Sequence, residues 1–216
     1  MTYSKITCAS LLVFFLSACA PVTPIAISPL PTSTNISPDE PVPASDWVSV
    51  YFSEPDNPSA NSYRGGPDAA LVTAIGAARS SVDAALYDLD LWSLRDALIN
   101  AHERGVSVRL VTESDYLDEN EIQDVIAAGI PVIDDQRESL MHNKFIVIDN
   151  YEVWSGSMNM TVNGAYKNNN NLIRIASPRL AENYHTEFEE MFTSQLFGDY
   201  ISAHTPHPSL EINGTR

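Results

Sequence analysis

Apolar and polar positions follow two different periods from residue 46 onward, and the periods change in a regular order along the chain. Short runs rich in Val and Ile predict strands, and longer runs with apolar residues three and four apart predict helices. The predicted strands are residues 46–52, 81–89, 106–113, 130–134 and 171–177, with a hairpin over 144–157. The predicted helices are a segment that opens at Pro67 and residues 91–105, 118–128 and 179–196. This alternation indicates an α/β domain with a largely buried sheet.

The predicted hairpin carries a group of polar residues at its open end. Two apolar runs, "KFIVID" and "EVWSGS", flank a D-N pair that is typical of two-residue turns. If that pair forms the turn, His142 lies opposite Ser157. Strand side chains alternate between faces, so His142 projects with Lys144, and Ser157 projects with Asn159. The pattern therefore predicts that four polar side chains converge on one patch.

The first residues form an export signal. Lys5 precedes an apolar run that is too short for a membrane-spanning helix but has the size of a secretory signal. The run ends in "LSAC", which resembles the lipobox of bacterial lipoproteins, where the cysteine is lipidated and becomes the first mature residue. Residues 1–18 are therefore predicted to be a signal peptide and Cys19 the lipidation site. The alternative is a plain signal peptide that is cut near the small residues.

Composition divides the rest of the chain. Residues 19–45 are rich in Pro, Ser and Thr and predict an extended tether. With 216 residues and 44% hydrophobic content, the chain suits one domain plus extra segments, here residues 46–197 and a polar tail at 198–216. The two cysteines, Cys8 and Cys19, lie outside this domain, which excludes a disulfide or a cysteine metal site within it. A lipid anchor predicts a place in the cell envelope, at the outer membrane or the outer face of the plasma membrane.

The chain is strongly acidic. The formal net charge is −16, and removal of residues 1–18 takes away only Lys5 and leaves −17. Proteins that bind nucleic acid tightly usually carry a basic face, so this charge counts against avid, non-specific DNA binding. A local positive pocket remains compatible with it.

The polar patch favours phosphoryl-transfer chemistry. An imidazole can attack phosphorus or move a proton, an ammonium group can hold a phosphate oxygen, and Ser and Asn add neutral hydrogen bonds. "HNKFIVID" resembles the H-x-K-x-x-x-x-D motif of the phospholipase D superfamily, with His142, Lys144 and Asp149 in the motif positions, and "GSMN" from Gly156 resembles the G-S-x-N element that follows it. From average residue usage, about 1% of chains of this length would contain the first motif by chance. The second element at the right distance makes a coincidence rarer still.

The resemblance spans residues 48–192 and concerns the small single-motif form, like exported bacterial endonucleases and mitochondrial cardiolipin hydrolases. It implies a phospholipase D-like sandwich, a central mixed β-sheet flanked by helices. It also implies that one motif's histidine forms a phosphohistidine while a second motif's histidine protonates the leaving oxygen. This chain has one motif, so the resemblance implies a homodimer in which Lys144 of both subunits, helped by Ser157 and Asn159, holds one phosphate. The scheme requires no metal and no cofactor.

One position departs from the family pattern. After "GSMN" the family usually has an acidic residue that orients the catalytic imidazole, and Asn170 stands there in this chain. An amide accepts a hydrogen bond but carries no charge to stabilise an imidazolium, which puts turnover in question. Asp149 is interpreted as a structural residue that fixes the hairpin turn.

Other polar and aromatic residues are interpreted as structural. Tyr87 is predicted to be a core residue, and His185 a surface or helix-packing residue. His204 and His207 are assigned to the tail, and the acidic run at 187–190 to a solvated helix face.

Three functions remain open at this point. The first is a phospholipase D-type phosphodiesterase that acts on phospholipid, which the lipid anchor and the acidic charge favour slightly. The second is an exported endonuclease that cleaves DNA or RNA, which the resemblance to bacterial endonucleases favours. The third is a weakly active phosphate-binding lipoprotein of the envelope.

Overall fold

The structure is a computed structural model that describes residues 47–137, 139–198, 205–212 and 214–215. The predicted signal peptide at 1–18, the lipidation site Cys19 and the tether at 19–45 lie outside the described residues and stay predictions. Within the described ranges, no helix has both the length and the apolar character needed to cross a membrane.

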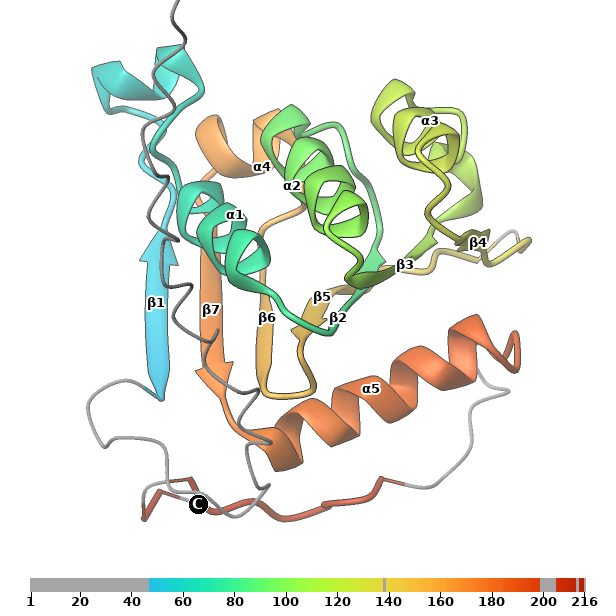
Figure 1. The fold of residues 1–216 in the computed structure, drawn as a ribbon. Coiled ribbons are helices and arrows are strands. Elements are labelled where there is room, and N and C mark those ends of the chain that lie inside the picture. Colours follow the sequence, from blue (N-terminus) through green and yellow to red (C-terminus); the bar gives the residue numbers. More distant parts are fainter. Residues whose placement is uncertain (1–46, 138, 199–204, 213, 216) are drawn as a thin grey trace, which may run out of the picture. The chain divides into compact units, whose positions relative to one another are not determined.

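Seven strands form one mixed sheet in the order β1-β7-β6-β5-β2-β3-β4 (Figure 1). The strands are β1 (Val48–Phe52), β2 (Ser81–Leu86), β3 (Ser107–Thr112), β4 (Val132–Asp134), β5 (Lys144–Ile148), β6 (Glu152–Gly156) and β7 (Asn171–Ala176). β2, β3 and β4 run parallel, whereas the other neighbouring strands pair antiparallel. The mixed sheet predicted from the sequence is thereby confirmed.

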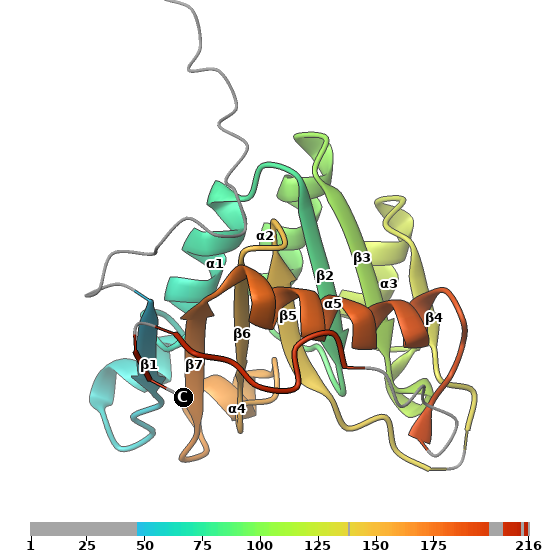
Figure 2. The ribbon, with the colours of Figure 1, turned by 90° about the horizontal axis from the view of Figure 1, so that it is seen from below.

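Helices cover both faces of the sheet. They are α1 (Asp68–Ala77), α2 (Trp92–Glu103), α3 (Asn120–Ala127), α4 (Val162–Tyr166) and α5 (Pro178–Phe192). Leu71, Leu98 and Ile122 of α1, α2 and α3 share one buried cluster with Ile146 of β5. α5 crosses the strands on the opposite face (Figure 2), where its Phe188 belongs to a second buried cluster. Successive residues of each central strand therefore enter different cores, which explains the near-continuous apolar runs in the sequence.

Local capping explains where the last two helices begin. The Ser177 side chain accepts a hydrogen bond from the Leu180 N–H, and Pro178 occupies the first turn of α5. α4 begins at Thr161, whose hydroxyl accepts from the Gly164 N–H at 2.9 Å. The sequence analysis missed α4 and two 3₁₀ turns, 58–62 and 114–116, because segments of three to five residues are too short to show a period.

The register of the β5–β6 hairpin differs from the prediction by one residue. Ile148 faces Glu152, whereas a two-residue turn would have placed it opposite Tyr151. Asp149 and Asn150 do form the turn, both with positive φ, and the Tyr151 N–H closes it on the Ile148 carbonyl. The Tyr151 carbonyl accepts from the Ser177 N–H, so Tyr151 is an extra residue that bonds outside the hairpin. The expectation that His142 lies opposite Ser157 is therefore wrong.

Candidate active site

His142 and Lys144 lie at the start of β5, the central strand of the sheet. Lys144 is the first residue of the strand, and His142 comes two residues earlier with an exposed side chain. Lys144 shares the face of Ile146, toward the core that contains α1 and α2. The Lys144 ammonium donates a hydrogen bond to the His142 carbonyl at 3.1 Å. This bond joins the Lys144 side chain to the backbone of His142, two residues earlier.

Tyr87 joins the histidine and the lysine. It follows β2, whose Leu86 pairs with Lys144. The Tyr87 ring meets the His142 ring edge to face, with centroids 4.6 Å apart, and the Lys144 Nζ lies 5.2 Å from the centre of the same ring. Burial lowers the pKa of Lys144. The interpretation of Tyr87 as a core residue is wrong, because its half-buried ring forms one wall of the site.

Ser157 belongs to a second group at the same end of the sheet, where β6 ends and β7 begins. Its hydroxyl donates to the Asn170 Oδ1 at 2.9 Å and accepts from the Asn171 N–H at 3.0 Å. Gly156 permits this approach, because a Cβ there would lie 2.4 Å from the Asn171 carbonyl oxygen. These contacts, and not the alternation along β6, decide where Ser157 points.

Asn170 makes hydrogen bonds with Ser157, Gly164 and Ser53. Its amide nitrogen Nδ2 donates to the Gly164 carbonyl at 2.9 Å, and its backbone N–H donates to the Ser53 hydroxyl at 2.7 Å. Within one chain, Asn170 therefore orients Ser157 and fastens α4 to the end of β1.

Asn159 lies after β6 beside α4. Its Oδ1 is buried and has no hydrogen-bond partner among the described residues. Gly164 allows the backbone to come this close, since a Cβ there would meet the Asn159 carbonyl oxygen at 2.2 Å. Asn159 thus keeps an unused acceptor at the end of the sheet that carries the site.

Asp149 lies at the other end of β5 and fixes the hairpin turn. Its carboxylate accepts hydrogen bonds from the N–H groups of Arg79, Ser80 and Ser81, and from the Ser80 hydroxyl. Burial alone would raise the pKa of Asp149, but these hydrogen bonds outweigh it and lower the pKa. The loop between α1 and β2 is thereby joined to the hairpin.

The structure thus places four of the predicted site residues in two groups at one end of the sheet, with Asn159 near that end and Asp149 at the opposite end of β5. One contains His142 and Lys144, and the other contains Ser157 with Asn170. Among the described residues, no hydrogen bond joins the two groups directly.

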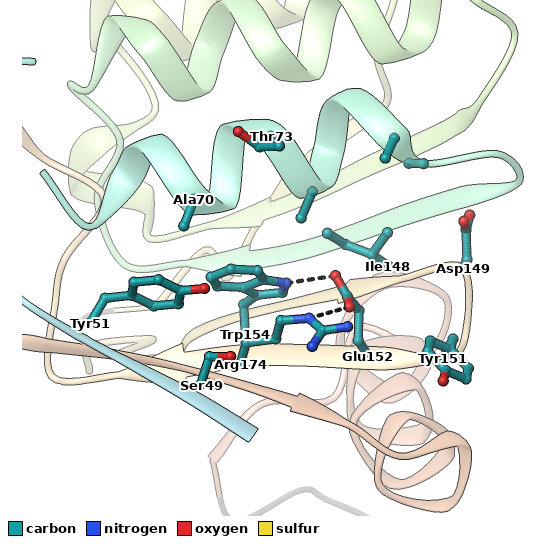
Figure 3. Close-up of a pocket in the computed structure, with 13 residues that line it drawn as sticks. Ser49, Tyr51, Ala70, Thr73, Ile148, Asp149, Tyr151, Glu152, Trp154 and Arg174 are labelled. Carbon is teal, nitrogen blue, oxygen red and sulfur yellow. Dashed lines mark hydrogen bonds and ion pairs between the residues drawn. The ribbon is translucent and has the colours of Figure 1, made fainter. Parts of the chain in front are cut away.

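A cavity of about 420 Å³ lies elsewhere, between α1 and the outer strands. Figure 3 shows Trp154 donating to Glu152, which also pairs with Arg174, across its floor. It reaches Asp149 at the hairpin turn, at the opposite end of β5 from His142. The residues that line it include none of the predicted catalytic residues.

The model of the family "Cardiolipin synthase, PLD-like domain" matches residues 71–192, which is more than half of the chain. The chain belongs to the phospholipase D superfamily. Human mitochondrial cardiolipin hydrolase is 34% identical over 124 residues, covering 56% of this chain and 49% of that protein. Phospholipase D of Rickettsia prowazekii is 34% identical over 116 residues, covering 53% of this chain and 57% of that protein. The match spans about half of the length of these relatives.

A solved structure supports the same PLD-like fold. Nuc from Salmonella typhimurium, a phospholipase D family member, superposes with a TM-score of 0.59 at 27% identity. The superposition covers 68% of this chain and 94% of that one. The PLD-like sandwich expected from the sequence is confirmed.

Tyr87 contacts both motif residues although the sequence pattern assigned it to the core, and Tyr116 packs against it. The two hydroxyls lie 3.1 Å apart, and this hydrogen bond, with burial, raises the pKa of Tyr116 to about 12. The available signal was the position of Tyr87 immediately after a strand that ends beside the motif. Strand order was needed to use that signal, because Tyr87 and His142 are far apart in the sequence.

His185 packs a helix against the sheet, as predicted. Its Nδ1 lies 3.0 Å from the buried Asp83 carboxylate, which also pairs with Arg109. The hydrogen bond to Asp83 raises the pKa of His185. His207 of the tail contacts Glu182 on the same helix.

Proposed function

We propose that this chain is a phosphodiester hydrolase of the phospholipase D type, with phospholipid as its substrate. A ring nitrogen of His142 bonds to phosphorus while the bond from phosphorus to the leaving oxygen breaks, and a second histidine donates its proton to that oxygen. Water then attacks phosphorus, the phosphorus–nitrogen bond breaks, and the second histidine takes up the proton. Lys144 holds the phosphate oxygens as their charge develops.

The observation that carries the proposal is the exposed imidazole of His142, held beside the ammonium of Lys144 on the ring of Tyr87. An exposed nucleophile next to a partly desolvated cation suits attack on an anionic phosphodiester. Ser157 lies at the same end of the sheet, where its hydroxyl proton is already donated to the Asn170 Oδ1.

The second histidine comes from a second subunit in this proposal. The chain contains five histidines, and only His142 is followed two residues later by a lysine. A two-fold dimer about an axis near His142 would place two such motifs around one phosphate.

Charge near the site supports phospholipid over nucleic acid. Asp88 directly follows Tyr87, and burial together with the nearby carboxylates of Asp90 and Glu119 raises the pKa of Asp88 to about 6. A nucleic acid would bring a row of flanking phosphates toward these groups, whereas a phospholipid need bring only its own headgroup. The relatives named mitochondrial cardiolipin hydrolase and phospholipase D support the same direction.

We further propose that Cys19 carries lipid and holds the domain at the cell envelope, near such a substrate. The proposal is based on the "LSAC" sequence and the spacer that follows it. Mass spectrometry of the membrane fraction is expected to show a lipid-modified Cys19. A Cys19→Ser protein that remains fully membrane-bound would contradict it.

A parallel cleavage assay tests the function. The mature chain and its His142→Ala variant are given phosphatidylcholine, cardiolipin, single-stranded DNA and double-stranded DNA, each with a metal chelator. Lipid cleavage that persists in chelator and disappears in the variant is expected. Cleavage of DNA alone would favour the nuclease function, and phosphate binding without any cleavage would favour the non-catalytic one. Activity that requires added Mg²⁺ would contradict the histidine mechanism.

A further inference from the structure

His142 lies between two residues whose backbone and side chains are anchored. Met141, immediately before it, is 3% exposed and packs in the buried cluster with Phe145 and Phe188. Asn143, immediately after it, accepts a hydrogen bond from the Tyr87 N–H at 2.8 Å and donates through Nδ2 to the Met191 sulfur at 3.3 Å. The exposed imidazole thus projects from a short stretch of fixed backbone.

Glu113 supplies the anchor on the Met141 side. It follows β3, its side chain is only 1% exposed, and its Oε2 accepts a hydrogen bond from the Met141 N–H. Its Oε1 accepts from the Ser114 hydroxyl at 3.2 Å. A buried backbone N–H without an acceptor is costly, so Met141 depends on this carboxyl group.

None of the described residues between β4 and β5 belongs to a strand. Asp135, near the start of this segment, accepts from the Ser114 N–H at 3.2 Å. The Ser114 hydroxyl also lies 3.4 Å from the Arg137 carbonyl oxygen. The residues that follow β3 therefore bind the segment at three points, and the bond from Met141 to Glu113 is the one next to His142.

We propose that Glu113 is a positioning residue for His142. The proposal rests on the proposed function, since it concerns the nucleophile of that reaction. Glu113 touches no reacting atom. It fixes the backbone from which the imidazole reaches phosphorus. A displacement of about 1 Å at a reacting group can lower the rate by about 10²-fold, so the effect falls on turnover.

Two substitutions of matched length test this role. Glu113→Gln keeps an oxygen acceptor for the Met141 N–H, and its amide nitrogen can donate to the Ser114 hydroxyl. Glu113→Met has nearly the same shape but no comparable acceptor. The Met variant is expected to lose about 10²-fold in kcat with little change in KM, while the Gln variant keeps most of the turnover.

Asp83→Asn is the matched control. Asp83 is an equally buried carboxyl on a neighbouring strand, but it pairs with Arg109 and His185 and makes no contact with the His142 segment. This variant is expected to lower the melting temperature and leave kcat unchanged at temperatures where it is folded. A loss of kcat that simply followed melting temperature across the three variants would overturn the positioning role.

Two measurements that need no turnover complete the test, one on the wild-type chain and one on the variants. The Met141 amide is expected to exchange with solvent more slowly than that of the exposed Leu140, and the His142 ring resonance is expected to shift in the Met variant only. A folded Met variant with wild-type kcat would overturn the proposal. If the Met variant does not fold, the exchange rate of the Met141 amide in the wild type decides the role of Glu113. Exchange as fast as that of the Leu140 amide would overturn the proposal. If no phosphodiester is cleaved, the proposed function fails, while the exchange and resonance data still decide the role of Glu113.

Discussion

Lys144 and Lys167 both place an ammonium group over a tyrosine ring, at 5.2 Å from Tyr87 and 5.6 Å from Tyr63 respectively. They differ in solvation, because Lys144 is half-buried and has a lowered pKa, whereas Lys167 is exposed. A partly desolvated cation interacts more strongly with an anionic transition state than a solvated one. Comparing variants of the two lysines therefore tests whether the partly desolvated ammonium of Lys144 contributes to turnover more than the solvated ammonium of Lys167.

Lys144→Ala is expected to lower turnover by at least ~10²-fold, the loss typical of one transition-state donor, and His142→Ala to abolish it. Lys167→Ala, which removes a similar contact away from the motif, is the control and should retain full activity. Steady-state kinetics on the preferred substrate check this prediction. Equal losses in the two lysine variants would contradict it.

Asn170 offers a test of stability at the same scale. Asn170→Asp removes the donor to the Gly164 carbonyl and places a negative charge beside it, so the free energy of unfolding should fall by about 1–3 kcal/mol. Asn169→Asp makes the same change of charge at an exposed position and should stay within about 0.5 kcal/mol of the wild type. Urea denaturation measures both variants. A midpoint in Asn170→Asp equal to that of the control would show that the bond to Gly164 contributes nothing.

At the scale of elements, the β5–β6 hairpin connects the site to the rest of the sheet. One end carries His142 and Lys144, and the other is fastened through Asp149 to the loop before β2. The D-N pair is suited to its turn because Asp and Asn tolerate positive φ. At the extra residue, Tyr151, the carbonyl accepts a hydrogen bond from Ser177 of the β7–α5 connection, a contact that no local pattern shows.

Asp149→Asn keeps a residue that tolerates the turn but removes the charge. The free energy of unfolding at pH 7 should fall by about 1–2 kcal/mol, since hydrogen bonds to a charged acceptor are weakened. The pKa of Asp149 is lowered by folding, so its stabilisation is complete above the unfolded pKa of about 4 and is lost as pH falls through the lower folded value.

The difference in stability between wild type and Asp149→Asn should therefore shrink in acid. Urea denaturation between pH 7 and pH 3 measures it. A difference that stays constant over this range would contradict the assigned role of the carboxylate.

At the scale of the whole molecule, the single motif makes a second subunit necessary for the proposed chemistry. If both histidines of a dimer are needed, a chain that lacks His142 inactivates its wild-type partner. Equal co-expression of wild type and His142→Ala, with random pairing, is then expected to give about one quarter of the wild-type specific activity. Light scattering should show a dimer. About one half of the activity, or a fully active monomer, would contradict the paired mechanism.

The sequence by itself determined the order of the main strands and helices, the α/β class and the spacing of the motif. These features are local, because strand and helix periods extend over a few residues and His142 and Lys144 are two residues apart on one strand. The motif also led to the superfamily before any geometry was available.

Only the tertiary structure decided which other residues complete the site. Tyr87 and Glu113 reach the His142 segment because β2 lies between β5 and β3, and strand order is set by packing of the whole sheet. Ser157 is oriented by Asn170 and Asn171, at the start of a neighbouring strand, and the hairpin register differs by one residue from that of a two-residue turn. Contacts between residues far apart in the sequence produce no periodic pattern along the chain. A register shift of one residue also reverses the face of every side chain in a strand. The geometry of this site therefore had to come from the folded structure.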